Sequence, residues 1–344
     1  MGETVRVIVL GTGQMGSAIA ELLLEKPGLE LVGAFGRRRE RAGTDLGLAL
    51  GRAEPLGLAV ESDLATVLER TRPSVAIQAT CSRLADAEGE IALCLSHGVH
   101  LISIAEEMAW PAASSPERAA RLDALAREHG VVAIGTGVNP GFVLDLLVVT
   151  LTGVCSRVDA IRARRVNDLA PYGPTVLRSQ GVGLTPEAFR AAVADGTVVG
   201  HVGFRESIAM VASALGWQLE RVDETREPIV SSVHRETQHA TVEPGQVAGC
   251  LHRAVGFVDG RPAIELEHPQ QIRPEAEGVV TADVIEISGV PDVRLEGSPE
   301  IPGGVATAAL AVNLVPRVLS AEPGLRSMIE LPPAAAIPSG ARHG

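Results

Sequence analysis

The opening segment of the chain constrains the fold most, because a strand pattern, a glycine triplet and a helix pattern follow one another there. Residues 5–11, VRVIVLG, are an apolar run, rich in β-branched residues, that ends in glycine, which is typical of a buried parallel strand. Gly11, Gly13 and Gly16 then have GxGxxG spacing, and SAIAELLLEKPG predicts a helix that proline and glycine end. The spacing alone is weak evidence, but in this order it predicts a dinucleotide-binding unit.

Each glycine has a distinct predicted role in that unit. Gly11 permits the tight turn, Gly13 lets the backbone approach a pyrophosphate, and Gly16 allows the helix to pack closely on the strand. The positive end of the helix dipole then faces the phosphates. The alternative is a glycine-rich turn that binds no ligand, which the order of strand, turn and helix disfavours. The loop residues predicted to bind the cofactor are Gly11, Thr12, Gly13, Gln14, Met15 and Gly16.

Three consecutive arginines follow the second predicted strand, residues 29–36. An NAD-binding chain carries an acid near this point, roughly 20 residues past the glycines, to hold the ribose 2′-hydroxyl. Arginine instead matches a phosphate with two parallel hydrogen bonds. A solvated charge run that opens the next helix is the alternative, and Glu40 could still serve a ribose, so NAD stays open as a second cofactor. We predict NADP as the preferred cofactor, with contacts at Gly36, Arg37, Arg38 and Arg39.

Strands and helices continue to alternate as far as residue 138. Strand patterns at residues 73–80, 99–108 and 131–137 are separated by helix patterns, which indicates a doubly wound parallel sheet. Ligands of such sheets bind outside the carboxyl ends of the strands. The residues at these ends are Ala79, Thr80 and Asn139, predicted to contact the cofactor, and Glu106 and Glu107, predicted to be catalytic.

Composition disfavours several classes of protein. The 344-residue chain carries a formal net charge of -12, whereas nucleic-acid binders usually present a basic face, so a small-molecule enzyme is the better prediction. No apolar run reaches the roughly 18 residues of a membrane span, and the N-terminal residues lack the pattern of a signal peptide. The four cysteines form no C-x-x-C pair, so we predict no metal site or disulfide framework and expect a reducing cytoplasm.

A single lysine and a single tyrosine limit the chemistry. Lys26 falls on a predicted surface turn, whereas a Schiff-base mechanism needs a buried lysine. Tyr172 has no lysine in Tyr-x-x-x-Lys spacing, which excludes that kind of dehydrogenase site. Proton transfer must therefore come from carboxylates, histidines or water.

The hydrophobic pattern changes after residue 138. Residues 139–153 predict a helix, residues 158–168 alternate like an antiparallel strand, and residues 252–268 predict a hairpin around Asp259-Gly260. We therefore expect an α+β second domain that binds the substrate and dimerises. The predicted organisation is a Rossmann domain at 1–138, this second domain at 139–304, a C-terminal helix within 305–330 (residues 305–321) that returns to the first domain, and a disordered tail at 331–344.

Two groups of polar residues are candidates for the chemistry. Glu106 and Glu107 follow a strand that ends near the expected nicotinamide, where a carboxylate could take a proton from a substrate ammonium or orient water. An exposed helix start is the alternative for this pair. Residues 164–168 offer arginines for a substrate carboxylate and acceptors for an ammonium, with an exposed strand of mixed charge as the alternative, and a structural role is the alternative for His201. The predicted substrate contacts are Arg164, Arg165, Asn167, Asp168 and His201.

Several unusual strings carry a family resemblance that spans nearly the whole chain. They are GTGQMGSAIA, ISIAEEMAWP, GTGVNPGF, ARRVNDLAPYGPTVLRSQGVGLTPEAF, GHVGFRESIAM, ELEHPQQI and IPGGVATAALAVN. With these strings the sequence resembles the 2,4-diaminopentanoate dehydrogenase family. The resemblance implies a Rossmann domain like that of dihydrodipicolinate reductase, oxidative deamination of 2,4-diaminopentanoate at C4 during ornithine degradation, NAD or NADP as the oxidant, and a homodimer. It also implies that a glutamate at the end of the strand predicted at residues 99–108, Glu106 or Glu107, acts on the amine.

Three functions stay open from the sequence. The first is the deaminating diamino-acid dehydrogenase, in which Arg164 or Arg165 pairs with the substrate carboxylate. The second is an amine dehydrogenase or reductive aminase that acts on ketones without a carboxylate, as relatives of the family do. The third is a non-catalytic NADP sensor, which the paired glutamates disfavour. Dihydrodipicolinate reductase itself is disfavoured, because the sequence lacks its histidine-rich helix start and nearby lysine.

Overall fold

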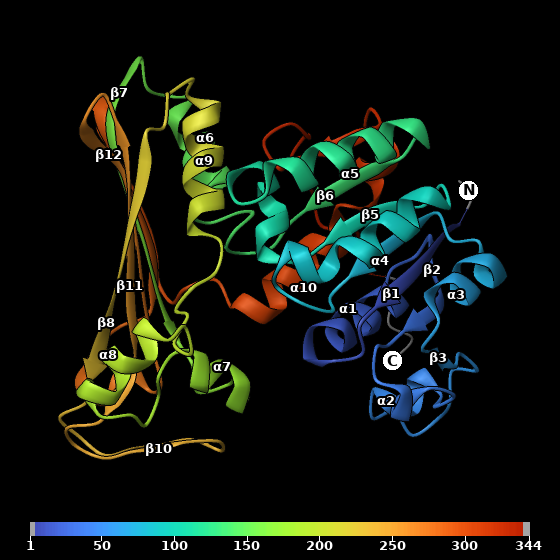
Figure 1. Ribbon diagram of the computed structural model, residues 1–344, viewed down its shortest axis with the longest axis horizontal. Coiled ribbons are helices and arrows are strands. Elements are labelled where there is room, and N and C mark those ends of the chain that lie inside the picture. Colours follow the sequence, from blue (N-terminus) through green and yellow to red (C-terminus); the bar gives the residue numbers. More distant parts are fainter. Residues whose placement is uncertain (1–3, 340–344) are drawn as a thin grey trace. The chain divides into compact units, whose positions relative to one another are not determined.

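The computed structural model describes residues 4–339, and the chain divides into two compact units (Figure 1). The Rossmann unit contains the residues up to Phe142 and those from Pro302 onward. The second unit contains Val143–Ile301. The chain therefore leaves the Rossmann unit once and returns to it.

The Rossmann unit is built on a seven-stranded sheet in which every neighbouring pair of strands is parallel. The strand order reverses between β1 and β4, which is where ligands of such open sheets bind. The predicted doubly wound parallel sheet is confirmed. In spatial order the strands are β15 (Gly324–Arg326), β6 (Val132–Gly135), β5 (His100–Ser103), β4 (Val75–Gln78), β1 (Val5–Leu10), β2 (Leu29–Phe35) and β3 (Val60–Glu61).

Helices cover both faces of this sheet (Figure 1). Helix α1 packs against α10, and α4 packs against both α3 and α5. The helices are α1 (Gln14–Leu24), α2 (Leu46–Ala49), α3 (Leu64–Thr71), α4 (Leu84–Ser96), α5 (Pro116–Glu128), α10 (Gly303–Asn313) and α11 (Val315–Leu319), with 3₁₀ turns η1 (Arg39–Arg41), η2 (Glu106–Ala109) and η3 (Pro111–Ala113).

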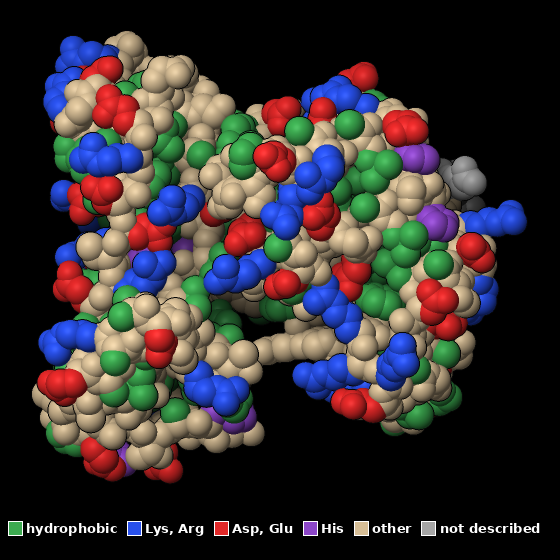
Figure 2. All heavy atoms as spheres, viewed as in Figure 1, with side chains coloured by type: hydrophobic (Ala, Val, Ile, Leu, Met, Phe, Trp, Pro, Cys, Tyr) green, Lys and Arg blue, Asp and Glu red, His purple; other side chains and the backbone are tan. Residues whose placement is uncertain are grey.

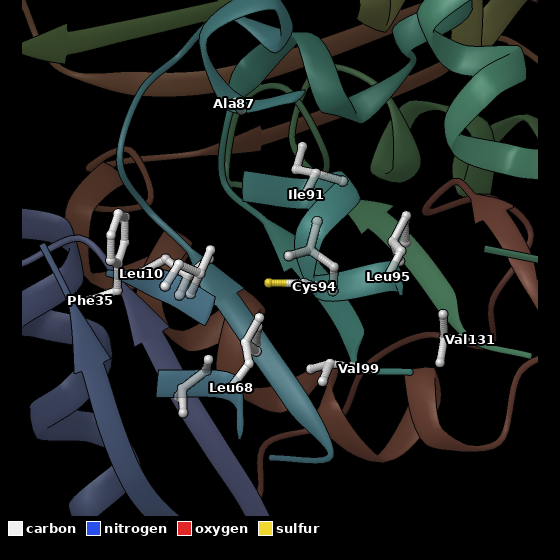
Figure 3. Packing of buried hydrophobic residues seen from close by; sticks show 14 of the residues in the cluster. Leu10, Phe35, Leu68, Ala87, Ile91, Cys94, Leu95, Val99 and Val131 are labelled. Atoms are coloured by element: carbon white, nitrogen blue, oxygen red, sulfur yellow. The ribbon is translucent and has the colours of Figure 1, made fainter. Parts of the chain in front are cut away.

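A large apolar cluster of the Rossmann unit lies between α4 and the sheet (Figure 3). Ile91, Cys94 and Leu95 of α4 pack in one cluster with strand residues that include Leu10 and Phe35. Burying a side chain of this size contributes about 1.5–3 kcal/mol. The cluster therefore fixes the ends of β1 and β2, and with them the loops that follow.

The second unit is built on a six-stranded mixed sheet. Strand β7 is parallel to β12 and antiparallel to β13, and the remaining neighbours are antiparallel. The predicted hairpin is confirmed, because Asp259 and Gly260, with φ values of 50° and 71°, join β11 to β12. In spatial order the strands are β14 (Val293–Gly297), β13 (Ala282–Val290), β7 (Arg157–Asp168), β12 (Arg261–Gln271), β11 (Val247–Val258) and β8 (Arg221–Val230), beside a ribbon of β9 (Arg235–Glu236) and β10 (Thr241–Val242).

Helices cover one face of this sheet, and ion pairs occupy the other. Helix α9 packs on β11 and β12 and contacts α6. On the opposite face, Arg162 pairs with Glu265 and Arg164 pairs with Glu267. Basic and acidic side chains alternate along the left-hand edge of Figure 2, where Figure 1 has these strands. The helices of this unit are α6 (Leu146–Thr152), α7 (Pro174–Ser179), α8 (Pro186–Ala194) and α9 (Phe204–Ala214), with one 3₁₀ turn, η4 (Pro274–Glu277).

Two predicted helices differ from those in the structure. The helix predicted at 139–153 starts later, as α6, because Gly141 has a φ of +123° that a right-handed helix does not accommodate. Asp145 accepts the backbone N–H of Leu146 and so caps α6 at its actual start. The helix predicted at 305–321 is two helices, α10 and α11, because Pro316 has no N–H with which to continue α10.

The last part of the chain also differs from the prediction. Strand β15 extends the sheet beside β6, although its three residues carry no recognisable periodicity. The backbone N–H of Ile337 donates to Asn313 Oδ1 at 2.9 Å, and Lys26 Nζ donates to the Ile337 carbonyl oxygen at 2.8 Å. A disordered tail is therefore the wrong prediction as far as residue 339, and residues 340–344 of the predicted tail lie outside the described part of the chain.

Between residues 4 and 339, no helix is long and apolar enough to cross a membrane. Within the same range, no three histidine, cysteine, aspartate or glutamate side chains are grouped as metal ligands. All four cysteines are free thiols.

Candidate active site

The glycine loop between β1 and α1 combines two crowded positions with one open position. Gly11 has a φ of +111°, and a Cβ there would lie 2.6 Å from the Ala79 carbonyl oxygen. A Cβ on Gly16 would lie 1.9 Å from the Gly11 carbonyl oxygen. At Gly13, the N-cap of α1, no atom lies within 4 Å of the Cβ position. Gly11 and Gly16 thus make the close contacts that shape the turn, whereas the space beside Gly13, at the N terminus of α1, is open. This open space fits the pyrophosphate of a dinucleotide.

The other predicted cofactor contacts of β1, β2 and β4 gather around this loop. Gln14 and Met15 are the first two residues of α1. A Cβ on Gly36 would lie 3.3 Å from Thr12 Oγ1, which brings the end of β2 against the loop. The backbone N–H of Ala79 donates to the Leu10 carbonyl oxygen at 2.7 Å. The structure therefore brings these predicted contacts together.

The arginines after β2 have unequal surroundings. Arg37 is bound to α4, because its Nε donates to Glu90 Oε1 at 2.5 Å and its Nη2 donates to the Asp86 carbonyl oxygen at 2.6 Å. Arg38 and Arg39 are exposed and pair with no residue in the described part of the chain. Two of the three predicted arginines are thus available to a phosphate, and the third already has a partner.

One further arginine supports the loop, although the sequence did not single it out. Arg41 Nη1 donates to the Thr12 carbonyl oxygen at 2.7 Å, which ties η1 to the glycine loop. A pattern search for consecutive arginines misses this residue because Glu40 interrupts the run.

Buried hydrogen bonds connect the ends of β4 and β5. Ser103 Oγ donates to Gln78 Oε1, and Gln78 Nε2 donates to Thr80 Oγ1 at 2.7 Å. Thr80 Oγ1 in turn donates to Glu90 Oε2 at 2.5 Å. Ser103 Oγ also accepts the backbone N–H of Ala105, the residue before η2, at 3.0 Å. These bonds hold the start of η2 in a fixed position relative to the predicted cofactor contact Thr80.

The structure separates the two glutamates of η2. Glu107 Oε2 accepts the backbone N–H of Leu84 at 2.8 Å, so this carboxylate caps the N terminus of α4. Glu106 is hydrogen-bonded to the Ser82 side chain, and burial raises the pKa of its carboxyl group. A raised pKa suits a carboxyl group that exchanges protons with a substrate. The surroundings of Glu106 thus suit proton exchange, whereas the Glu107 carboxylate is bound to the start of α4.

The end of β6 contributes two more polar residues. The backbone N–H of Thr136 donates to the Ser103 carbonyl oxygen at 2.8 Å, which places this residue beside the end of β5. Its hydroxyl is buried without a hydrogen-bond partner in the described chain. Asn139 follows three residues later and is half-buried. The carboxyl ends of β4, β5 and β6 thus all present polar side chains, as the sequence predicts.

In the second unit, a row of polar side chains crosses the helix-covered face of the sheet. The strand register pairs Asp283 of β13 with Arg165 of β7, and Asn167 of β7 with Gln270 of β12. It also pairs His268 of β12 with His252 of β11, and the six side chains are all buried. We call these residues the polar row. They are Asp283, Arg165, Asn167, Gln270, His268 and His252.

Arg165 forms an ion pair inside the polar row. Its Nη1 donates to Asp283 Oδ1 at 2.6 Å, and its Nη2 donates to the Ile301 carbonyl oxygen. The guanidinium has five N–H donors, so donors remain for a ligand. Asn167 Oδ1 and His201 Nε2 are buried without a hydrogen-bond partner among the described residues. Because buried polar atoms are nearly always paired, these two atoms point to a polar ligand.

Burial lowers the pKa of the three histidines around this group. The ring centroid of His201 lies 5.0 Å from that of His268 and 4.8 Å from that of Phe204. Burial lowers the pKa of His201 to about 3, with neighbouring His252 and the Arg165 charge acting in the same direction. Burial also lowers the pKa of His268 and of His252. Neutral imidazoles can each donate one hydrogen bond and accept another, which suits them to an ionic substrate of either sign.

The structure does not bring every predicted substrate contact into this group. Arg164 lies on the opposite face of the sheet, where its Nε is 2.7 Å from Glu267 Oε1. Asp168 Oδ1 accepts the backbone N–H groups of Ala170 and Arg273 at 2.8 and 2.9 Å, so it closes a turn. His268 does belong to the group, although the sequence did not select it. Its position two residues after Leu266 in an alternating strand is the signal that could have identified it.

Two known family models match the chain, and the boundary between them lies near the start of the second unit. The sequence model of the 2,4-diaminopentanoate dehydrogenase C-terminal domain matches residues 142–343, and that of the dihydrodipicolinate reductase N-terminus matches residues 5–134. The chain belongs to the 2,4-diaminopentanoate dehydrogenase family. It is 43% identical over 335 residues to 2,4-diaminopentanoate dehydrogenase of Acetoanaerobium sticklandii, which covers 96% of this chain and 94% of the relative.

Amine dehydrogenases are also similar to this family member. The amine dehydrogenase of Streptomyces virginiae is 26% identical over 353 residues, covering 95% of this chain and 96% of the relative. The solved structure of amine dehydrogenase from Mycobacterium smegmatis has a TM-score of 0.86 and 30% identity, covering 96% of this chain and 97% of that one. The protein is therefore an amine-acting oxidoreductase that uses a nicotinamide cofactor.

Proposed function

We propose that the protein catalyses the NAD(P)-dependent oxidative deamination of 2,4-diaminopentanoate to 2-amino-4-oxopentanoate and ammonia, reversibly. The polar row is the observation that favours a diamino acid over a simple amine as the substrate. A site for a plain ketone or alkyl amine has no use for a buried guanidinium beside unpaired Asn167 and His201 atoms. Burying such groups is costly unless a ligand pairs with them. The 43% identity to the enzyme of A. sticklandii supports the same choice.

NADP is the proposed preferred cofactor, with NAD as a second. The open position at Gly13 and the N terminus of α1 would hold the pyrophosphate. Exposed Arg38 and Arg39 would hold the 2′-phosphate. When bound, the oxidised nicotinamide accepts a hydride from carbon.

Glu106 would do the proton chemistry. The C4 ammonium of the substrate must lose a proton before its carbon can release hydride, and the Glu106 carboxylate accepts that proton. Loss of hydride from C4, with its electron pair, leaves an iminium. Glu106 releases that proton to solvent, then takes a proton from the water that adds to C4 and passes it to nitrogen. As the C–N bond breaks and ammonia leaves, the hydroxyl on C4 gives its remaining proton to Glu106. One water is consumed, and the ketone oxygen comes from it.

The polar row would bind the amino-acid end of the substrate. The free N–H donors of Arg165 would pair with the carboxylate, since an arginine fork matches its two oxygens. Asn167 Oδ1 and the imidazole Nε2 of His201 would accept hydrogen bonds from the 2-ammonium group. Asp283, already bound to Arg165, would keep the guanidinium in place.

The test follows the absorbance of the reduced nicotinamide. Purified protein with NADP⁺ and 2,4-diaminopentanoate should reduce the cofactor and release ammonia. The matched comparison is 2-aminopentane, which keeps the reacting amine but lacks the carboxylate and 2-amino groups. Equal rates with both amines, or NADPH oxidation with 2-pentanone and ammonia but not with the diamino acid, would move the protein to the simple-amine reading. Tight cofactor binding without turnover on either amine would favour a sensor.

Two further statements stay predictions under this proposal. The family resemblance predicts a homodimer, which sedimentation equilibrium of the purified chain would test. Four free thiols agree with a reducing cytoplasm. Fractionation of cells that express the tagged protein would test that location.

A further inference from the structure

Glu90 of α4 holds Arg37 close to the exposed Arg38 and Arg39. Its Oε1 accepts from Arg37 Nε at 2.5 Å, and its side chain is only 12% exposed. Arg37 has two further contacts on the same side, with the Asp86 carbonyl oxygen at 2.6 Å and Cys81 Sγ at 3.5 Å. The hydrogen bond with Glu90 raises the pKa of Arg37, as a charged pair should. Arg37 is thus fixed and electrically neutralised.

The second oxygen of Glu90 is also used. Oε2 accepts from Thr80 Oγ1 at 2.5 Å, and Thr80 accepts from buried Gln78. The carboxylate is therefore held on both sides and cannot turn away from Arg37 without breaking the bond with Thr80. This geometry is that of a fixed charge rather than of a mobile surface pair.

Glu90 and Arg39 line the same cavity. The cavity has a volume of about 660 Å³, and Phe35 and Leu64 contribute apolar walls. It lies at the end of β2, and Asp63 is a second carboxylate in its lining. A negative charge is therefore built into the region where the adenosine end of the cofactor would bind.

We infer that Glu90 sets the cofactor selectivity of the enzyme, by withdrawing Arg37 from the 2′-phosphate and leaving Arg38 and Arg39 to bind it. The inference rests on the proposed function. A carboxylate near the phosphate weakens NADP⁺ binding in two ways, because it repels the phosphate and because it occupies a guanidinium that could pair with it. NAD⁺ has a hydroxyl at that position and experiences neither effect to the same degree. Glu90 would therefore favour NAD⁺ relative to a cluster in which all three guanidinium groups are free.

The test measures binding without catalysis. The ligands are 2′,5′-ADP and 5′-AMP, which differ by the 2′-phosphate and carry no nicotinamide. Titration calorimetry on the full chain gives a Kd for each. Glu90→Gln should tighten 2′,5′-ADP by about tenfold, the effect of one added arginine–phosphate pair, and leave 5′-AMP within about twofold. Adding Arg37→Met to that variant should remove the gain.

Glu88→Gln is the matched control. Glu88 lies on the same helix and also pairs with arginines, Arg118 and Arg121, but not with the arginine cluster. This variant should leave the ratio of the two Kd values unchanged. A thermal melt of each variant shows whether the fold is kept.

A second variant keeps the inference testable if Glu90→Gln does not fold. In the otherwise native chain, Arg37→Met should weaken 2′,5′-ADP by less than threefold, whereas Arg38→Met or Arg39→Met should weaken it by about tenfold. A large loss in Arg37→Met would overturn the inference, and so would an equal weakening of both ligands in Glu90→Gln. Failure of the native chain to bind either ligand or NADP⁺ would refute the proposed cofactor itself, and the inference with it.

Discussion

Replacing Glu106 by glutamine tests the proposed chemistry most directly. Glutamine keeps the size of the side chain and its hydrogen bond with Ser82, but it cannot accept a proton. A positioned general base typically contributes 10²–10⁴-fold, so kcat should fall by about that factor, or about 2.7–5.4 kcal/mol of barrier. The glycine loop is untouched, so the Kd for NADP⁺ should stay within about twofold of the native value.

Glu107→Gln is the matched control, one residue away. Its carboxylate accepts the backbone N–H of Leu84 at the start of α4. Glutamine can still accept this bond but loses the charge, which is worth about 0.3–1 kcal/mol at a helix N terminus. We expect the melting temperature to fall by about 1–4 °C, and turnover to stay within about threefold of the native rate.

A pH profile gives an independent readout for the same pair. Burial raises the pKa of Glu106 above its ordinary value of 4.5, so the acid limb of kcat/KM should lie above that pH. The limb should persist in Glu107→Gln and disappear in Glu106→Gln. Equal turnover in the two variants, or a loss confined to Glu107→Gln, would refute the assignment.

Two further predictions concern binding and stability. Gly13→Ala should fold normally, because no atom lies within 4 Å of the added Cβ, but it should weaken NADP⁺ binding about tenfold or more by crowding the phosphate. Gly16→Ala should instead lose stability, because its Cβ would lie 1.9 Å from a carbonyl oxygen. Calorimetry measures the first effect and a thermal melt the second. Buried His201, with a pKa of about 3 against 6.5 for the unfolded chain, should make stability fall as the pH drops from 6.5 towards 3, since only the unfolded chain then gains the proton. The expected slope is about 1.4 kcal/mol per pH unit for this histidine, and urea midpoints that do not move between pH 7.5 and 5.5 would contradict it.

The parts of the fold that the sequence predicts are those whose signals are local. Strand, glycine turn and helix of the first βα unit lie within one short segment, so their order is visible directly. Strand β15 is different, because only its pairing with β6, from the first half of the chain, makes these three residues a strand. The restart of α6 after Gly141 is likewise set by a backbone conformation that the apolar pattern does not reveal.

In the candidate cofactor site, too, the sequence predicts only the features whose signals are local. The glycine spacing and the arginine run predict where a dinucleotide binds, because loop and cluster are both short motifs. The pairing of Arg37 with Glu90 was not predictable from them, because Glu90 lies on a helix that reaches the cluster only through the packing of α4 on the sheet. A charge cluster in a sequence therefore gives the location of a phosphate site but not the number of arginines that are free to bind it.

The alternation of side chains along a strand, by contrast, could have distinguished the two candidate arginines, Arg164 and Arg165. Ile161 and Ala163 lie four and two residues before Arg165, so their side chains share its face of the strand. Alternation therefore places Arg165 on the buried face and Arg164 on the other. What alternation could not supply is Asp283, which meets Arg165 only through the β7–β13 register. A buried ion pair of this kind rarely stabilises a fold more than apolar residues of the same size would. Its presence among the buried side chains of this face is therefore better explained by substrate recognition than by folding. Arg165→Met leaves the buried Asp283 carboxylate without its partner and should cost about 3–5 kcal/mol of stability. At a temperature where this variant is folded, the KM for the diamino acid should rise far more than the Kd for NADP⁺.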